Sequence, residues 1–282
     1  MIFADASKLI RPKGWQYDCT SNALERWCGF DRAAADDSDP TVIDIYDIIG
    51  EDWWTGEGFT EKKLAGILRK VGNADVTVNI NSPGGDVFQG VAIYNRLKRH
   101  EGKVNVNVTG LAASAASVIA MAGDKVTMYT GTMMMIHRAW GMVIGNRNDL
   151  EAMIPVFDKV DRSMADIYTE RTNESDDDIL AMMDAETWLT VEDAVENGFA
   201  DEVVEENKTK AHAKVPDDIL AKRQIEAALA KEGHTRKQRE AIIKNLSGSR
   251  DAPGSTAPRD AGNEWAGYFD GLVETMNRSV GK

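Results

Sequence analysis

Apolar residues follow two different spacings along the middle of the chain, and each spacing predicts a different element. Alternating or β-branched runs, typical of strands, occur over residues 41–50, 74–82, 103–110 and 125–130. Runs with apolar residues three or four apart, typical of helices, occur over residues 60–71, 87–100 and 112–123. The repeated strand–helix order predicts an α/β layered domain over residues 41–205.

A longer apolar stripe follows the last of these strands. From Asn148 to Arg171 the apolar residues fall three, four or one apart, which predicts a long helix. Pro155 lies inside this stripe, so the helix is either kinked in its first turns or begins later. A second helix is expected over residues 176–184.

The two ends of the chain differ from this middle part. Residues 1–40 are predicted to be an irregular N-terminal arm. Residues 206–282 are predicted to be a basic tail, flexible or processed, with two short amphipathic helices separated at Gly233. The Gly-, Ser- and Pro-rich residues 247–262 are typical of a linker, and residues 263–279 could form a last helix.

The net charge and the cysteine content argue against several classes of protein. The formal net charge of −13 argues against a nucleic-acid binder or a membrane-surface binder, although the tail is mildly basic. The two cysteines, Cys19 and Cys28, have no metal-ligand spacing and are too few for a disulfide framework, so a reduced, cytoplasmic setting is expected. No signal peptide or membrane span is predicted.

A serine and a histidine are candidates for nucleophilic catalysis. Ser114, in GLAASAASVIAMAG, follows a predicted strand and opens a predicted helix, where free N–H groups favour negative charge and the Ala115 N–H is one donor. His137 follows the apolar run TMMMI, and a core strand could deliver it to a cleft as the base. Tight packing is the alternative for Ser114, Ser117 is a rival serine, and a structural role is the alternative for His137.

A glycine turn could complete such a site. In NINSPGGDV, the residues Gly84 and Gly85 follow a proline at the end of a predicted strand. Glycine lets the backbone approach a substrate closely or turn an N–H outward, so this turn could supply a second oxyanion donor. An ordinary turn is the alternative.

Several separated motifs occur in an order that resembles a known family. The stretches INSPGGDVFQGVAIYNRL, GLAASAASVIAMAG, MMMIHRAWG and ETWLTVEDAVENGFADEV resemble the proteolytic subunit of the Clp protease, ClpP. They resemble still more closely the ClpP-like head maturation (prohead) proteases of tailed bacteriophages. The resemblance covers residues 41–205. It implies a ClpP/crotonase-like spiral of ββα units with a protruding handle helix, here residues 148–171.

The resemblance also implies roles for individual residues. Ser114 would be the nucleophile, His137 the base, and Gly84 and Ala115 the oxyanion hole. The family usually places an aspartate two residues before the aromatic residue of the ETWLT region, where this chain has Glu186. We favour Glu186 as the group that orients His137 and keep Asp184, two residues upstream, as the rival.

The expected function is that of a serine endopeptidase that needs no metal and no cofactor. It would process capsid, portal or scaffold proteins in the host cytoplasm, within the assembling prohead, as a homo-oligomer formed through residues 148–171. The first alternative is a degradative ClpP-type subunit that works with an ATPase. The second alternative, from another class, is a crotonase-fold protein that binds acyl-CoA.

Overall fold

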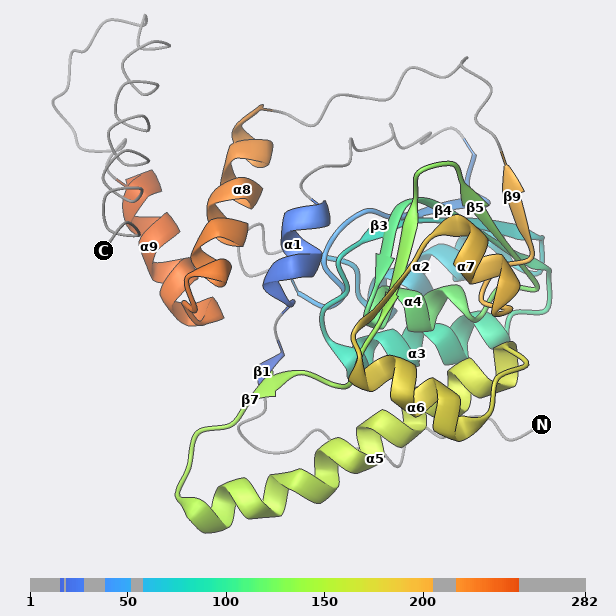
Figure 1. Cartoon of the computed structure of the whole chain (residues 1–282). Coiled ribbons are helices and arrows are strands. Elements are labelled where there is room, and N and C mark those ends of the chain that lie inside the picture. Colours follow the sequence, from blue (N-terminus) through green and yellow to red (C-terminus); the bar gives the residue numbers. More distant parts are fainter. Residues whose placement is uncertain (1–15, 18, 28–38, 52–57, 205–216, 249–282) are drawn as a thin grey trace, which may run out of the picture. The chain divides into compact units, whose positions relative to one another are not determined.

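A largely parallel sheet forms the centre of the protein (Figure 1). The structure, a computed structural model, describes residues 16–17, 19–27, 39–51, 58–204 and 217–248. Within these residues the main sheet has seven strands. Five of them lie side by side in parallel, in the order β2 (Val42–Ile45), β3 (Val76–Ser82), β4 (Val104–Ala113), β5 (Lys125–Tyr129) and β9 (Glu202–Val204).

Strand β4 is long enough to pair with two different strands in succession. Its residues 105–108 pair with β5, and its residues 111–113 pair with β6 (Met133–Ile136), both in parallel. Strand β8 (Thr187–Leu189) pairs antiparallel with β6. Because β4 and β6 are parallel and Ala113 pairs with Met135, the residues that follow both strands emerge at the same edge.

Helices alternate with the strands from β2 to β5. Side-chain caps begin several of the helices; for example, Thr60 accepts the Lys63 N–H and Asp86 accepts the Phe88 N–H. The helices between and after the strands are α2 (Glu61–Val71), α3 (Val87–Lys98), α4 (Ala115–Ala120), α6 (Asp176–Asp184) and α7 (Val191–Glu196). This order confirms the predicted α/β fold class.

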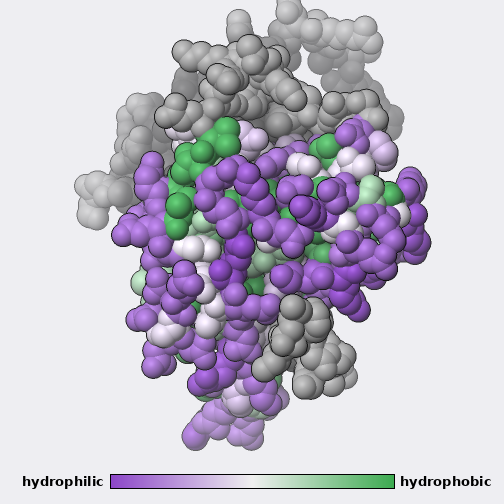
Figure 2. All heavy atoms as spheres, turned by 90° about the vertical axis from the view of Figure 1, so that its right-hand side faces the viewer, coloured by the Kyte–Doolittle hydropathy of each residue, from purple (hydrophilic) through white to green (hydrophobic). Residues whose placement is uncertain are grey.

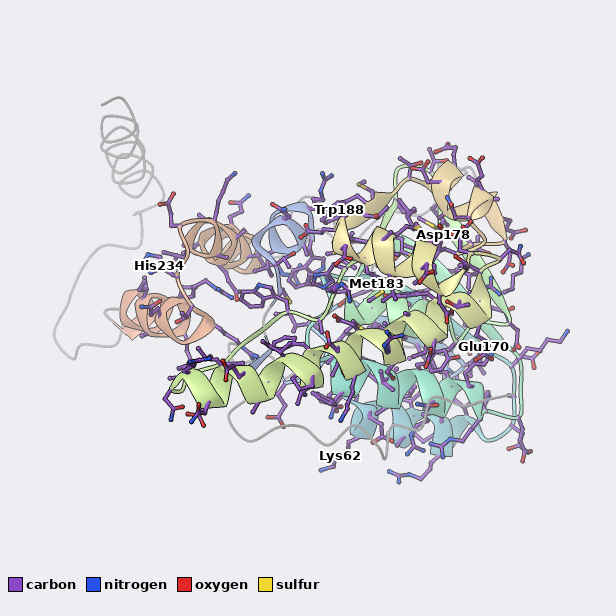
Figure 3. All side chains as sticks on the ribbon, turned by 60° about the horizontal axis from the view of Figure 1, so that its bottom comes forward. Lys62, Glu170, Asp178, Met183, Trp188 and His234 are labelled. Carbon is purple, nitrogen blue, oxygen red and sulfur yellow. The ribbon has the colours of Figure 1, made fainter. Side chains whose placement is uncertain are left out.

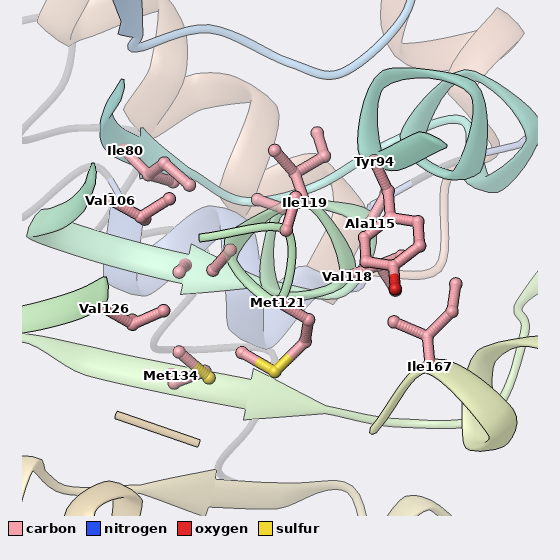
Figure 4. Packing of buried hydrophobic residues seen from close by; sticks show 14 of the residues in the cluster. Ile80, Tyr94, Val106, Ala115, Val118, Ile119, Met121, Val126, Met134 and Ile167 are labelled. Carbon is pink, nitrogen blue, oxygen red and sulfur yellow. The ribbon is translucent and has the colours of Figure 1, made fainter. Parts of the chain in front are cut away.

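The main core lies between the sheet and the helices that cover one of its faces. In Figure 4, Val106 and Val126 of the sheet lie near Ile119 of α4, and all three side chains are fully buried. The opposite face of the end of β4 has a smaller cluster. There Leu111 and Met135 pack with residues of the N-terminal arm, because neighbouring strand residues point to opposite faces.

The long helix confirms the prediction and decides its open question. Helix α5 (Arg147–Arg171) begins after Asn146, which caps it together with Asp149, and Pro155 lies inside it. The alternative of a later start is therefore wrong. The second half of α5 packs on the core, whereas the first half lies away from the sheet (Figure 1).

The N-terminal arm is more ordered than predicted. Strand β1 (Gln16–Tyr17) pairs antiparallel with β7 (Gly141–Met142), and helix α1 (Ser21–Trp27) follows it. The Trp27 Nε1 donates to the Asn81 carbonyl at 3.0 Å. The prediction of an irregular arm is wrong for these residues, because the buried Trp27 anchors a helix too short to be recognised from its sequence.

The two predicted tail helices are confirmed as α8 (Asp217–Lys231) and α9 (Arg236–Gly248). They are separated by Gly233, whose φ of 79° suits glycine. The predicted linker beyond residue 248 and the last helix over 263–279 lie outside the described residues. Residues 205–216, next to the expected boundary at 205/206, also lie outside them, so the three-part organisation stays a prediction.

Candidate active site

Ser114 occupies a strained turn between β4 and α4. Its φ of 55° and ψ of −124° lie where side chains other than glycine are rare, at a cost of about 1–3 kcal/mol. The Ser114 N–H donates to the Met135 carbonyl of β6 at 2.9 Å, which fixes the turn. Its side chain makes no capping bond to α4, so the Oγ atom is left for other contacts.

His137 lies directly against this serine. The residue follows β6, and its Nε2 lies 2.7 Å from Ser114 Oγ. The side chain is only 8% exposed. Burial lowers the pKa of His137 from 6.5, and the charge of Glu186 opposes this shift. A neutral imidazole at this distance can accept the hydroxyl proton, as a general base must.

The rival serine has a different position. Ser117 is fully buried, and its Oγ donates to the Ser114 carbonyl at 2.6 Å and lies 2.8 Å from the Tyr168 hydroxyl. The first contact links Ser117 to the turn at Ser114, and the second links α4 to α5. A substrate has no access to Ser117 Oγ in this arrangement, so its role here is structural.

The glycine turn lies against the serine. A Cβ atom on Gly84 would lie 2.7 Å from Ser114 Cβ and 3.1 Å from the Ala115 nitrogen, and Gly84 has a φ of 92°. The Gly84 N–H donates to Ser82 Oγ at 3.2 Å. Among the described residues, the N–H groups of Gly85 and Ala115 have no acceptor.

Gly85 is a residue that the sequence reasoning did not single out as a donor. The resemblance implies Gly84 as the source of the N–H, and both glycines lie in the same turn. Which of two adjacent N–H groups is free depends on the Ser82 hydroxyl, and no sequence pattern indicates that contact.

Neither candidate for the third catalytic group forms a hydrogen bond with His137 within the described part of the chain. Glu186 Oε1 accepts from Asn22 Nδ2 at 3.1 Å and from Trp188 Nε1 at 3.4 Å. Asp184 lies at the end of α6 and binds the guanidinium of Arg138, with Nη2 and Oδ2 2.8 Å apart. The structure therefore brings Ser114, His137 and the glycine turn together, and leaves the orienting carboxylate as a prediction.

The described residues show no sign of a metal centre or a membrane helix. No group of three or more His, Cys, Asp or Glu side chains among them is arranged to hold a metal ion. None of the helices that the structure describes is long and apolar enough to cross a bilayer.

Comparison with known proteins shows the family to which this chain belongs. A family model described as "Clp protease" matches residues 62–207, which include Ser114, His137 and the glycine turn. The chain belongs to the Clp protease family. This result confirms the recognised ClpP-like character and gives no support to the crotonase-fold alternative.

Two individual relatives match slightly less than half of this chain. An ATP-dependent Clp protease proteolytic subunit from Bacteroides fragilis is 33% identical over 132 residues, which cover 46% of this chain and 64% of the relative. Proteolytic subunit 2 from Rhodococcus jostii is 34% identical over 132 residues, 46% of this chain and 68% of the relative. The chain thus spans less than two thirds of the Bacteroides relative.

A solved structure is similar to part of this chain. A point mutant of ClpP1 from Listeria monocytogenes matches with a TM-score of 0.50 and 27% identity, over 60% of this chain and 94% of that one. The relatives named here are Clp proteolytic subunits. The narrower resemblance to phage head maturation proteases therefore stays a prediction.

Proposed function

We propose that this chain is a serine endopeptidase in which Ser114 is the nucleophile and His137 the general base. The 2.7 Å contact between His137 Nε2 and Ser114 Oγ carries this proposal. The imidazole accepts the hydroxyl proton while the Ser114 oxygen attacks a peptide carbonyl, and the protonated imidazole then gives the proton to the leaving amine. Water, activated by the same base, hydrolyses the acyl-enzyme.

Backbone N–H groups would stabilise the oxyanion. The Ala115 N–H at the start of α4 is one donor, and the turn at Gly84 and Gly85 supplies the other. The resemblance favours Gly84, whereas the absence of an acceptor for the Gly85 N–H among the described residues favours Gly85. Either donor requires the turn to stay against Ser114.

Glu186 is our candidate for the group that orients His137. It acts on the pKa of His137 through its charge, and its Oε2 makes no hydrogen bond within the described residues. The rival Asp184 is less suited, because its two oxygens already bind Arg138.

The first half of α5 supports self-association. Figure 2 shows a face on which hydrophilic side chains predominate. On α5, Leu150 is 46% and Ile154 is 61% exposed, and Ile144 just before the helix is 83% exposed. Leu150 and Ile154 lie about one turn apart on the helix, and exposed apolar side chains at this spacing favour burial against a second copy of the chain.

Two biological settings share this chemistry. Processing of capsid, portal or scaffold proteins during phage head maturation is supported by the resemblance of the sequence motifs. Degradation together with an ATPase is supported by the relatives, which are named as ATP-dependent Clp proteolytic subunits. We keep head maturation as the first proposal and ATP-dependent degradation as the second.

Labelling with a serine-directed fluorophosphonate tests the chemistry. We expect wild-type protein to be labelled at Ser114, and Ser114→Ala and His137→Ala to abolish labelling. His100→Ala is the matched control, because His100 is remote from the site and contacts the Ala74 carbonyl. A folded wild-type protein that is not labelled would refute the proposal.

Co-expression separates the two settings. Ser114→Ala is expressed with the candidate capsid and scaffold proteins, and loss of processing with retained assembly supports head maturation. Stimulated proteolysis of a folded substrate by a host unfoldase and ATP supports the degradative setting instead.

A further inference from the structure

The backbone that follows His137 is tied to two helices. The Arg138 N–H donates to the Met183 carbonyl of α6 at 3.2 Å, and the Ala139 N–H donates to Asp161 Oδ1 of α5 at 2.6 Å. Figure 3 shows α6, which carries Met183, beside α5. The proposed base therefore lies between strand β6 and two anchored residues.

Asp161 is an acidic residue in the buried part of α5. Its side chain is 4% exposed, and Val160 and Met164 beside it belong to the main core. Burial raises the pKa of Asp161, and the bonds from Ala139 and Arg138 oppose this shift. A buried carboxylate is costly unless its oxygens are hydrogen-bonded, so a helix that only had to pack here would carry an apolar residue.

Arg138 connects this carboxylate to the other helix. Its Nη1 donates to Asp161 Oδ2 at 3.2 Å, and its Nε and Nη2 donate to the two oxygens of Asp184. A planar guanidinium suits this geometry, because it presents several donors in a fixed fork. The residue directly after His137 is thereby held between carboxylates of α5 and α6.

We propose that Asp161 is a positioning residue for His137. By accepting the Ala139 N–H and the Arg138 guanidinium, it fixes the two residues that follow the base, and so holds the imidazole in contact with Ser114 Oγ. The inference rests on the proposed function. Misplacing a reacting group by roughly 1 Å costs about 10²-fold in rate. The gain in rate from a fixed His137 can therefore offset the free-energy cost of burying the Asp161 carboxylate.

Three variants of the full chain test this role. Asp161→Asn keeps an oxygen that accepts the Ala139 N–H, whereas Asp161→Leu keeps the branch at Cγ and removes the acceptor. Asp166→Asn is the matched control, because Asp166 lies on the same helix, is exposed and has no hydrogen bond or ion pair within the described residues. The measurement is the rate constant of fluorophosphonate labelling at Ser114, taken well below each variant's thermal midpoint.

We expect Asp161→Leu to lower the labelling rate constant about tenfold or more, and Asp161→Asn to stay within about threefold of wild type. Asp166→Asn should label like wild type. With a peptide substrate, kcat should fall in Asp161→Leu while KM changes little. A merely structural Asp161 would lower the thermal midpoint and leave the labelling of folded protein unchanged, and this result would overturn the inference.

A fourth variant, Arg138→Gln, covers the case in which Asp161→Leu does not fold. Arg138→Gln changes a side chain that is 36% exposed and removes the guanidinium between the two helices. We expect it to lower the labelling rate constant about threefold or more, and an unchanged rate would count against the inference. If folded wild-type protein is not labelled, the proposed function fails, and the inference fails with it. If wild type is labelled and the variants at Asp161 and Arg138 label at the same rate, only the inference fails.

Discussion

Adding one methyl group to Gly84 should disable the proposed oxyanion hole while the protein stays folded. The new Cβ would lie 2.6 Å from the Ala113 carbonyl oxygen, 2.7 Å from Ser114 Cβ and 3.1 Å from the Ala115 nitrogen. Two of these three neighbours are backbone atoms, so relief requires the turn itself to move. The φ of 92° at this position adds strain of about 1–3 kcal/mol for any residue except glycine.

The displacement sets the expected size of the effect. Ordinary contacts between non-bonded heavy atoms lie at about 3.5–4.0 Å, so the turn has to move by about 1 Å. A shift of that size at a reacting centre costs about 10²-fold in rate, or about 2.7 kcal/mol of activation free energy. We therefore expect Gly84→Ala to lower the fluorophosphonate labelling rate constant by about two orders of magnitude.

Gly131→Ala is the control for the strain alone. Gly131 has a similar φ of 84°, and a Cβ atom there would meet nothing within 4 Å. It should therefore lower the thermal midpoint by an amount set by the backbone strain and keep the wild-type labelling rate. If Gly84→Ala labels as fast as Gly131→Ala, the turn does not lie against the reacting atoms and the reasoning is refuted.

Four further predictions concern single side chains. Burial lowers the pKa of His137, so the labelling rate should fall to half at a pH below 6.5, where the imidazole becomes protonated. As the pH is lowered through the same range, the free energy of unfolding should also fall, because the unfolded chain binds the proton more readily. Ser117→Ala should cost about 1–3 kcal/mol in urea denaturation and keep labelling active, since it removes two buried hydrogen bonds. Glu186→Gln should slow labelling about tenfold or more, and more than Asp184→Asn does. Ile154→Glu should convert the assembly to smaller species in sedimentation experiments.

Each of these predictions has a clear contrary result. A labelling midpoint at or above pH 6.5 would mean that the environment of His137 favours its charged form. Loss of labelling in folded Ser117→Ala would give that serine a catalytic part. A larger effect of Asp184→Asn would make Asp184 the orienting group, and an unchanged assembly in Ile154→Glu would exclude the first half of α5 as the contact.

The sequence predicts the strand–helix order well because its apolar periodicity reflects burial directly. Residues of β3 and β4 alternate in the sequence and in the structure, and the stripe from Asn148 onward is α5. The sequence does not predict β1 and α1 of the N-terminal arm, because these elements are held by residues far away in the sequence. Trp27 is buried through a bond to Asn81 and through the guanidinium of Arg223, which lies 3.6 Å above its ring.

The site could be predicted only in part, for a similar reason. Spacing along the chain says nothing about the contact between Ser114 and His137, because that contact arises from the pairing of β6 with the last residues of β4. The resemblance to a family is what predicts that Ser114 and His137 act together. It did not supply the anchoring of the next two residues by Asp161, because that arrangement depends on how α5 and α6 meet.

The burial of Trp27 has a practical consequence for shortening this protein. The region shared with the Clp family model begins at residue 62, so a fragment cut to that region loses α1 and β2. Leu111, Ala113 and Met135, which are buried against the arm, would then be exposed to solvent next to Ser114 and His137. Such a fragment should aggregate, and a lack of labelling in it would say nothing about the full chain.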